Sequence, residues 1–74
     1  MIDIRFDPMR FARLVKANRE QLGLSQQELA DLIGVHKTRI QGYERGDLEC
    51  GPRAEVLIRM SFIFSVSIDD LIGR

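Results

Sequence analysis

The residues between positions 36 and 45 carry hydrogen-bonding side chains with the spacing of one helix face. If Ile40 faces inward, the rotation of about 100° per residue along a helix places the opposite face of this helix, and its first residue, outward. These outward positions are Lys37, Thr38, Gln41 and Gly42. Lys37 can donate to guanine O6 and N7, Gln41 can pair with adenine N6 and N7, and Thr38 can bond a base edge or contact the thymine methyl group. The chemistry that fits this face is recognition of bases in double-stranded DNA.

Cationic side chains flank the same face. Arg39 and Arg45 lie toward its edges and suit phosphates better than bases. His36 directly precedes the helix, where it could cap the helix or contact a phosphate. Gly42 would let the helix approach its ligand closely, although a glycine in mid-helix costs about 1 kcal/mol and could simply be tolerated.

The elements that must position these side chains lie between Gln26 and Arg45, a segment that predicts two short helices joined by a tight turn. The apolar stripes of the two helices are Leu29, Ala30 and Ile33, then Ile40 and Tyr43. The methyl side chain of Ala30 lets a second helix cross closely, and Gly34 can take the positive φ that the turn requires. The segment therefore predicts a helix-turn-helix.

Two polar features support this arrangement. Ser25 and Glu28 have the spacing of a capping box, so a helix should begin at Gln26 with its first amides and the positive end of its dipole facing outward. Glu44 falls on the inner side of the following helix, where a carboxylate requires a partner.

From about Arg19 to Ile72 the chain resembles the phage repressor and Cro family, the same broad family as the bacterial xenobiotic-response-element type regulators. The resemblance rests on the stretches REQLGLSQQELADLIGV, IQGYERG and VSIDDLIG. It implies binding to a palindromic double-stranded DNA operator as a homodimer, with the second helix of the motif in the major groove. It also implies that the outward positions named above contact bases.

The resemblance implies further roles for individual residues. Contacts to the DNA backbone are expected from Ser25, Gln26 and Gln27, which could otherwise be ordinary polar surface. The inward Glu44 is expected to pair with Arg19, because the family has an arginine at the corresponding place; the alternative is that both side chains are solvated.

The remaining pattern predicts an all-α fold, a compact five-helix bundle. The first helix should start at Pro8 behind the cap Asp7, bury Phe11, Leu14, Val15, Asn18 and Leu22, and end at Gly23. The third should run from Lys37 to Arg45 and stop at Gly46, the fourth from Arg53 to Phe64, and the last from Ile68 to Ile72. The expected inward residues of the last two are Val56, Leu57, Met60, Ile63 or Phe64, and Leu71.

The fourth helix has more apolar residues than one face can bury. Ile58 and Phe62, at i and i+4, predict either a dimer interface or an unusually complete core. Residues 1–7 form an N-terminal arm in which Ile2, Ile4 and Phe6 alternate with charged residues. That arm could be disordered or form a short strand across a dimer.

Composition limits the other possibilities. Seventy-four residues predict one domain, 1–74. The formal net charge is zero, with +2 in residues 1–46 and −2 in residues 47–74, and the loop after Gly46 carries Asp47 and Glu49 where the family often has basic residues. The single cysteine, Cys50, excludes an internal disulfide and suggests a reduced, cytoplasmic protein. No membrane segment, metal site, cofactor or small-molecule ligand is indicated.

Two functions remain. The first is a sequence-specific DNA-binding regulator, expected to be a repressor. The alternative is a protein-binding helix-turn-helix module such as an antitoxin or anti-regulator, favoured by the neutral charge and the acidic loop. An enzyme is not expected, because His36 is the only histidine and no catalytic spacing surrounds it.

Overall fold

The computed structural model describes residues 6–46 and 52–73, which form five α-helices and, within those ranges, no strand. The helices are α1 (Pro8–Gln21), α2 (Gln26–Ile33), α3 (Lys37–Arg45), α4 (Ala54–Phe64) and α5 (Ile68–Ile72). The all-α, five-helix prediction is confirmed. The predicted start of the fourth helix is wrong by one residue, because Arg53 has the extended angles of an N-cap, φ −67° and ψ 155°.

Short-range hydrogen bonds start the first two helices as the sequence predicts. The Asp7 carboxylate accepts from the amides of Met9 and Arg10 at 3.1 and 3.2 Å. Ser25 Oγ accepts from the Glu28 amide at 3.0 Å, while the Ser25 amide donates to Glu28 Oε1 at 2.9 Å. Each cap satisfies backbone donors that have no partner inside the helix, and so fixes where the helix begins.

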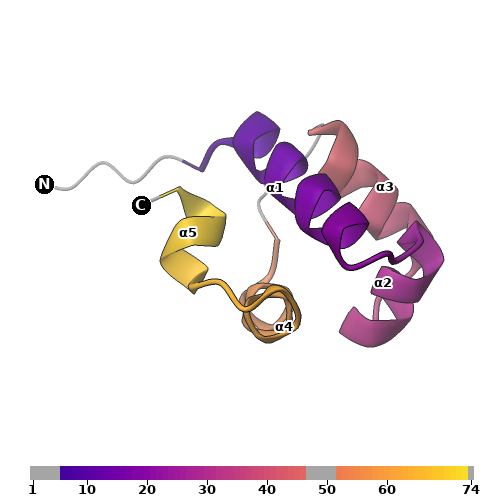
Figure 1. Cartoon of the computed structure of the whole chain (residues 1–74). Helices are drawn as coiled ribbons and strands as arrows, with labels where there is room; N and C mark the ends of the chain where they lie inside the picture. The colour runs from indigo at the N-terminus through magenta and orange to yellow at the C-terminus, as the bar shows by residue number, and fades with distance from the viewer. Residues whose placement is uncertain (1–5, 47–51, 74) are drawn as a thin grey trace, which may run out of the picture.

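The helix-turn-helix pair α2–α3 packs against α1, while α5 packs against α4 and α1 (Figure 1). The core draws on all five helices: Phe11, Val15, Leu29, Ala30, Ile33, Ile40, Tyr43, Val56, Met60, Phe64 and Leu71. At its centre the Phe11 ring lies 5.4 Å from the Phe6 ring and 5.6 Å from the Tyr43 ring, centroid to centroid. The predicted inward residues of α4 and α5 are buried or partly buried.

Leu22 is an exception to the predicted core. It was expected on the buried face of the first helix, but its side chain is half exposed. The prediction is wrong because α1 ends at Gln21 and Leu22 is the C-cap, where the chain turns away from the helix.

Two arginines secure the far ends of helices. Arg59 Nη1 of α4 donates to the Ile33 carbonyl at the end of α2 at 2.5 Å, and Arg10 Nη1 of α1 donates to the Asp70 carbonyl of α5 at 2.6 Å. Gly34, with φ 84°, follows Ile33, and a Cβ there would lie only 2.6 Å from Arg59 Nη1. The α2–α3 turn is therefore held both by its own backbone and by α4.

Several predictions concern residues outside the described ranges. These are the arm residues Ile2 and Ile4, Cys50, and the acidic residues of the loop after Gly46. Phe6, the last apolar residue of the arm, is partly buried and packs on the core.

Candidate nucleic-acid interface

The exposed face of α3 is the one that the sequence places outward. Ile40 and Tyr43 are 0% and 2% exposed, whereas Lys37, Thr38, Arg39 and Arg45 are exposed and Gln41 and Gly42 are partly exposed. The burial follows the 3.6-residue period of the helix. Donors and acceptors for hydrogen bonds are thus carried on a rigid helix with a fully packed back.

His36 caps this helix. Its Nδ1 accepts from the Thr38 amide at 3.2 Å and lies 3.0 Å from Thr38 Oγ1. Because Nδ1 is the acceptor, the proton of the neutral ring is on Nε2. His36 therefore fixes the first turn of α3 and leaves one donor that does not take part in the cap.

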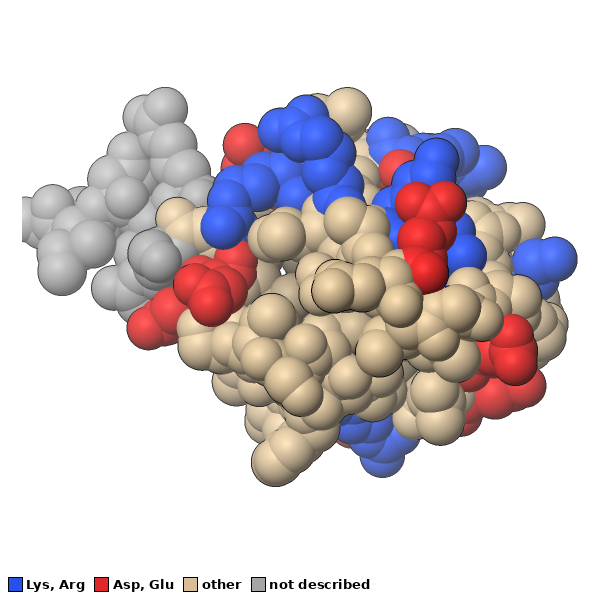
Figure 2. Space-filling view, in the orientation of Figure 1, with Lys and Arg blue, Asp and Glu red and all other residues tan. Residues whose placement is uncertain are grey.

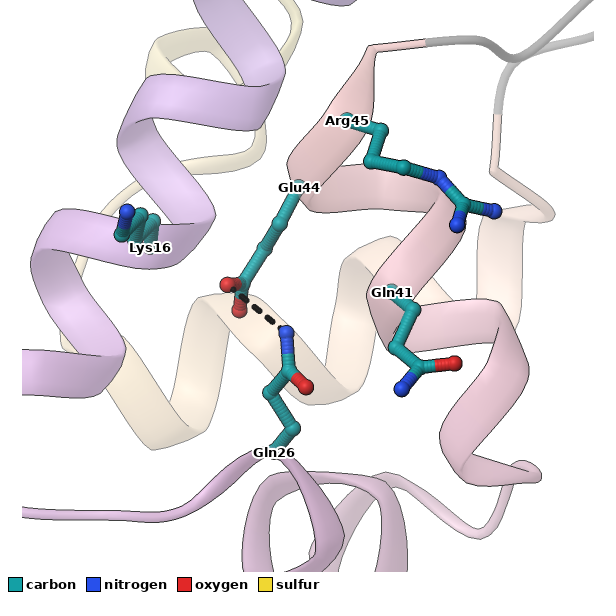
Figure 3. A pocket seen from close by; sticks show the side chains of 5 residues that line it. All are labelled: Lys16, Gln26, Gln41, Glu44 and Arg45. Atoms are coloured by element: carbon teal, nitrogen blue, oxygen red, sulfur yellow. Dashed lines mark hydrogen bonds between the residues drawn. The ribbon is translucent and has the colours of Figure 1, made fainter.

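A groove of ≈ 320 Å³ lies where α1, α2 and α3 meet, lined by Lys16, Gln26, Gln41, Glu44 and Arg45 (Figure 3). Two of these side chains are cations and two are amides. The groove thus brings three residues predicted to contact DNA, Gln26, Gln41 and Arg45, together with Lys16 of α1. Lys16 is exposed on α1 and was not among the residues predicted from the sequence to contact DNA. Its position one turn before Arg19 was the available signal.

Arg19 and Glu44 form a two-point ion pair beneath this groove. Arg19 Nε donates to Glu44 Oε2 at 2.7 Å and Arg19 Nη2 donates to Glu44 Oε1 at 3.0 Å, while Nη1 donates to the Leu24 carbonyl at 2.8 Å. The two side chains are only 12% and 7% exposed, so the alternative that both are solvated is wrong. The hydrogen bonds to Glu44 raise the Arg19 pKa above its ordinary value, against the opposing effect of burial. The pair ties α1 to α3.

The residues expected to contact the DNA backbone at the start of α2 all have partners within the chain. Gln26 Nε2 donates to Glu44 Oε1 at 3.2 Å, and Gln27 Nε2 donates to Asp31 Oδ1 at 2.9 Å. The Ser25 hydroxyl oxygen is used in the cap. The Gln26 contact joins residues from different helices, whereas the other two are local.

Arg39 lies on the other side of α3, away from the groove. It borders a second hollow of ≈ 160 Å³ that is also lined by Gly34, Val35, Tyr43, Arg53, Glu55 and Val56. Burial raises the pKa of Tyr43, and the positive charges of Arg39 and Arg53 partly oppose that rise. The second hollow thus places Arg53, predicted from the sequence only as the first residue of the fourth helix, close to Arg39, a candidate phosphate contact.

Ile58 and Phe62 are exposed on α4, by 45% and 81% respectively. The alternative that they complete the core is therefore wrong. Figure 2 shows mostly uncharged surface over α4, acidic side chains near α5, and Lys and Arg over α1 at the upper edge of that view. Ile58 and Phe62 thus form an apolar patch on α4, a helix that also exposes Glu55 and Arg59.

Within the two described ranges, no group of three or more His, Cys, Asp or Glu side chains could hold a metal ion. Among the same residues, no helix has the length and apolar character needed to cross a membrane.

Comparison with known proteins places these features in context. Residues 15–71 match the family model described as helix-turn-helix. The chain is 37% identical over 62 residues to YqaE, an uncharacterized HTH-type transcriptional regulator of Bacillus subtilis strain 168, covering 84% of this chain and 52% of YqaE. It is 32% identical over 66 residues to the cryptic phage CTXphi transcriptional repressor RstR of Vibrio cholerae, covering 89% of this chain and 57% of RstR. The chain thus spans about half the length of these curated relatives.

Among solved structures, the fold is similar to the P22 c2 repressor protein in complex with synthetic operator 9T. The TM-score is 0.75 and the identity 29%, and the match covers 84% of this chain and 91% of the repressor chain. The similarity therefore extends over nearly the whole of that DNA-bound domain.

Proposed function

Because this chain belongs to the helix-turn-helix family of phage repressor-like transcriptional regulators, we propose that it represses transcription by binding a palindromic DNA operator as a homodimer in the cytoplasm. The matched family and the curated relatives consist of DNA-binding regulators, not enzymes. The observation that carries the proposal is the exposed polar face of α3, held by a buried back on a fold similar to an operator-bound repressor.

In this proposal α3 enters the major groove, and Lys37, Thr38 and Gln41 contact base edges. Gly42 lies on the same face of α3, is partly exposed and adds no side chain there, so that the helix can approach the DNA closely. Lys16 and Arg45 at the groove, and Arg39 with Arg53 on the opposite side of α3, are placed to neutralise phosphates on the two flanking strands. The Nε2 proton of His36 provides one more donor for a phosphate at the leading end of α3.

A second copy of the chain is proposed to cover Ile58 and Phe62. Phe62 is 81% exposed, which is unusual for so large an apolar side chain, and it lies one turn from Ile58 on the same helix. Two recognition helices related by a two-fold axis would reach successive major grooves about 34 Å apart. The palindromic operator follows from that symmetry.

The test is selection of bound sequences from random duplex DNA, followed by affinity measurements at several salt concentrations. With roughly four to six phosphates neutralised per dimer, the slope of log affinity against log salt should be about −4 to −5. Lys37→Ala should cost about 1 to 3 kcal/mol on the preferred operator and relax preference at one position per half-site. Arg39→Ala is the matched control, which should weaken all sequences alike and reduce the slope. A salt-independent affinity, or selection of no sequence, would exclude this function.

The alternative is a protein-binding module that keeps the helix-turn-helix as a scaffold. The exposed apolar pair on α4 and the net charge of zero favour it. Absence of DNA binding in the same assay, together with loss of a protein partner on Phe62→Arg, would support the alternative.

A further inference from the structure

Tyr43 combines a buried ring with a hydroxyl that has no partner. The ring meets Phe11 edge to face, with centroids 5.6 Å apart, and the residue is only 2% exposed. Among residues 6–46 and 52–73, every fully buried side-chain nitrogen or oxygen has a hydrogen-bond partner, yet none of these residues bonds the Tyr43 hydroxyl. The hydroxyl therefore accounts for part of the small exposed area of the residue. Because Tyr43 lines the second hollow, the hydroxyl is open to that hollow.

Two cations border the same hollow. Arg39 of α3 and Arg53, the N-cap of α4, both line it. Burial raises the Tyr43 pKa and the positive charges of these arginines partly oppose that rise, as expected for guanidinium groups near the hydroxyl. Neither arginine forms an ion pair with another residue in the part of the chain that the structure describes. A hydroxyl donor beside two cations fits a ligand with negative charge.

The start of α4 adds to this preference. The other four helices each begin with a side chain that accepts from their first amides, whereas no side chain of the described residues caps α4. The positive end of the α4 dipole thus lies at the edge of the hollow, which Glu55 and Val56 of the first turn also line. Glu55 is the one acid among the described lining residues, and its carboxylate opposes an anion.

The hollow has room for a small ligand only. Its volume of ≈ 160 Å³ is several times the roughly 30 Å³ occupied by one water molecule, so a single phosphate group fits and a larger molecule does not. A phosphate group presents several acceptor oxygens, to which a hydroxyl and two guanidinium groups can all donate.

We propose that Tyr43 is a ligand-binding residue as well as a core residue: its hydroxyl and the guanidinium groups of Arg39 and Arg53 bind one oxyanion of the phosphate class in the second hollow. The oxyanion can come from the DNA backbone or from free phosphate in solution, and the two sources compete for one site. Binding of the DNA backbone there rests on the proposed function, whereas binding of free phosphate does not.

Inorganic phosphate added to the 74-residue chain without DNA tests the site directly. In ¹⁵N-labelled protein the Nε resonances of Arg39 and Arg53 should shift with phosphate to a plateau. Sodium chloride at equal ionic strength, which screens charge in the same way, should not produce that plateau. Because the chain has one tyrosine and no tryptophan, the fluorescence of Tyr43 gives a second reading at the same site.

Four variants assign the phosphate contact to particular side chains. Tyr43→Phe keeps the ring and should weaken phosphate binding about tenfold, the effect of losing a hydrogen bond to a charged group. It should stay folded, because the hydroxyl has no partner to lose. Arg53→Gln should also weaken binding, and Glu55→Gln should tighten it by removing the opposing charge. Arg13→Gln is the matched control, since Arg13 is exposed on α1 and does not line the hollow.

A DNA arm identifies the source of the oxyanion. Tyr43→Phe should lower the affinity for all duplex sequences about tenfold and leave the salt slope unchanged, because the hydroxyl carries no charge, whereas Arg53→Gln should lower the slope by about one. Phosphate should displace DNA from the parent more strongly than chloride does at equal ionic strength, and Tyr43→Phe should abolish this excess. If the DNA effect of Tyr43→Phe occurs without any shift by free phosphate, the oxyanion belongs to the DNA backbone.

The two hypotheses can fail separately. Phosphate binding that Tyr43→Phe weakens, in a protein that binds no duplex, would support the site and exclude the proposed function. The inference is wrong if Tyr43→Phe binds both phosphate and DNA as the parent does. Should Tyr43→Phe not fold, the inference fails if Arg53→Gln and Glu55→Gln, which change the charge in opposite directions, both bind phosphate like Arg13→Gln.

Discussion

Replacing Glu44 with alanine should destabilise this domain strongly without removing any group that the proposed DNA contact uses. The variant would leave the Arg19 guanidinium, 12% exposed, with the Leu24 carbonyl as its one remaining hydrogen-bond partner among residues 6–46 and 52–73. It would also remove the acceptor for Gln26. This single substitution therefore removes three hydrogen bonds to the carboxylate oxygens of Glu44.

The expected loss in the free energy of unfolding follows from the burial of the Arg19–Glu44 pair. Breaking a buried ion pair on one side costs about 3 to 5 kcal/mol, because the remaining charge is left without compensation. The small residual exposure of both side chains puts the expectation at the lower end, about 3 kcal/mol. For a domain of this length, that loss corresponds to a fall in Tm of at least about 12 °C.

Thermal unfolding followed by circular dichroism, with urea unfolding for the free energy, measures this effect. Arg19→Ala should cost a similar amount. Glu20→Ala is the matched control: it removes the same charge next to Arg19 but from an exposed site, and it should change stability by less than about 0.5 kcal/mol. Combining Arg19→Met with Glu44→Leu should recover most of the loss, because apolar side chains of similar size can replace a buried pair.

If Glu44→Ala and Arg19→Ala both unfold like the parent, the ion pair does not stabilise the fold. Two groups in direct contact should also show coupling of about 0.5 to 3 kcal/mol, so single-variant effects that simply add in the double variant would contradict a stabilising contact between them.

Three further outcomes are expected. Phe62→Arg should give a folded monomer in analytical ultracentrifugation, and a parent that sediments as a monomer even with operator present would exclude the α4 dimer. Tyr43 is the only tyrosine, so absorbance near 295 nm should report a titration midpoint above pH 10.0, because burial raises the pKa of Tyr43. Since the folded pKa is raised, the contribution of Tyr43 to stability is complete below pH 10.0 and is lost as the pH rises through the folded value. A midpoint at or below pH 10.0 would contradict the burial. The hydrogen bonds from Ser25 lower the pKa of Glu28 below 4.5, so its stabilising effect should be present above pH 4.5 and lost as the pH falls through the folded value. Glu28→Gln should therefore flatten the acid side of the profile of stability against pH, and a variant with the same acid slope as the parent would show that the capping box adds nothing.

The helix ends and the buried faces of α2 and α3 could be predicted from the sequence because they depend on local interactions. Asp7, Ser25 with Glu28, and Gly46 fix helix ends through bonds that close within three or four residues, so that their spacing alone predicts the boundaries. The buried stripes of α2 and α3 follow from helical periodicity in the same way. The exposed face of α3, and with it the candidate base contacts, was therefore predictable.

Contacts between side chains of different helices depend on the tertiary structure and could not be read from spacing along the chain. The Arg19–Glu44 pair was expected from a resemblance, but the diversion of Gln26 from solvent to Glu44 depends on how α2 crosses α3, and residues 18 positions apart carry no local signal of it. The same holds for Arg59 at the end of α2 and for the exposure of Phe62. Spacing along one helix shows which residues share a face, whereas the packing of neighbouring helices determines whether that face is covered and which partner each polar side chain meets.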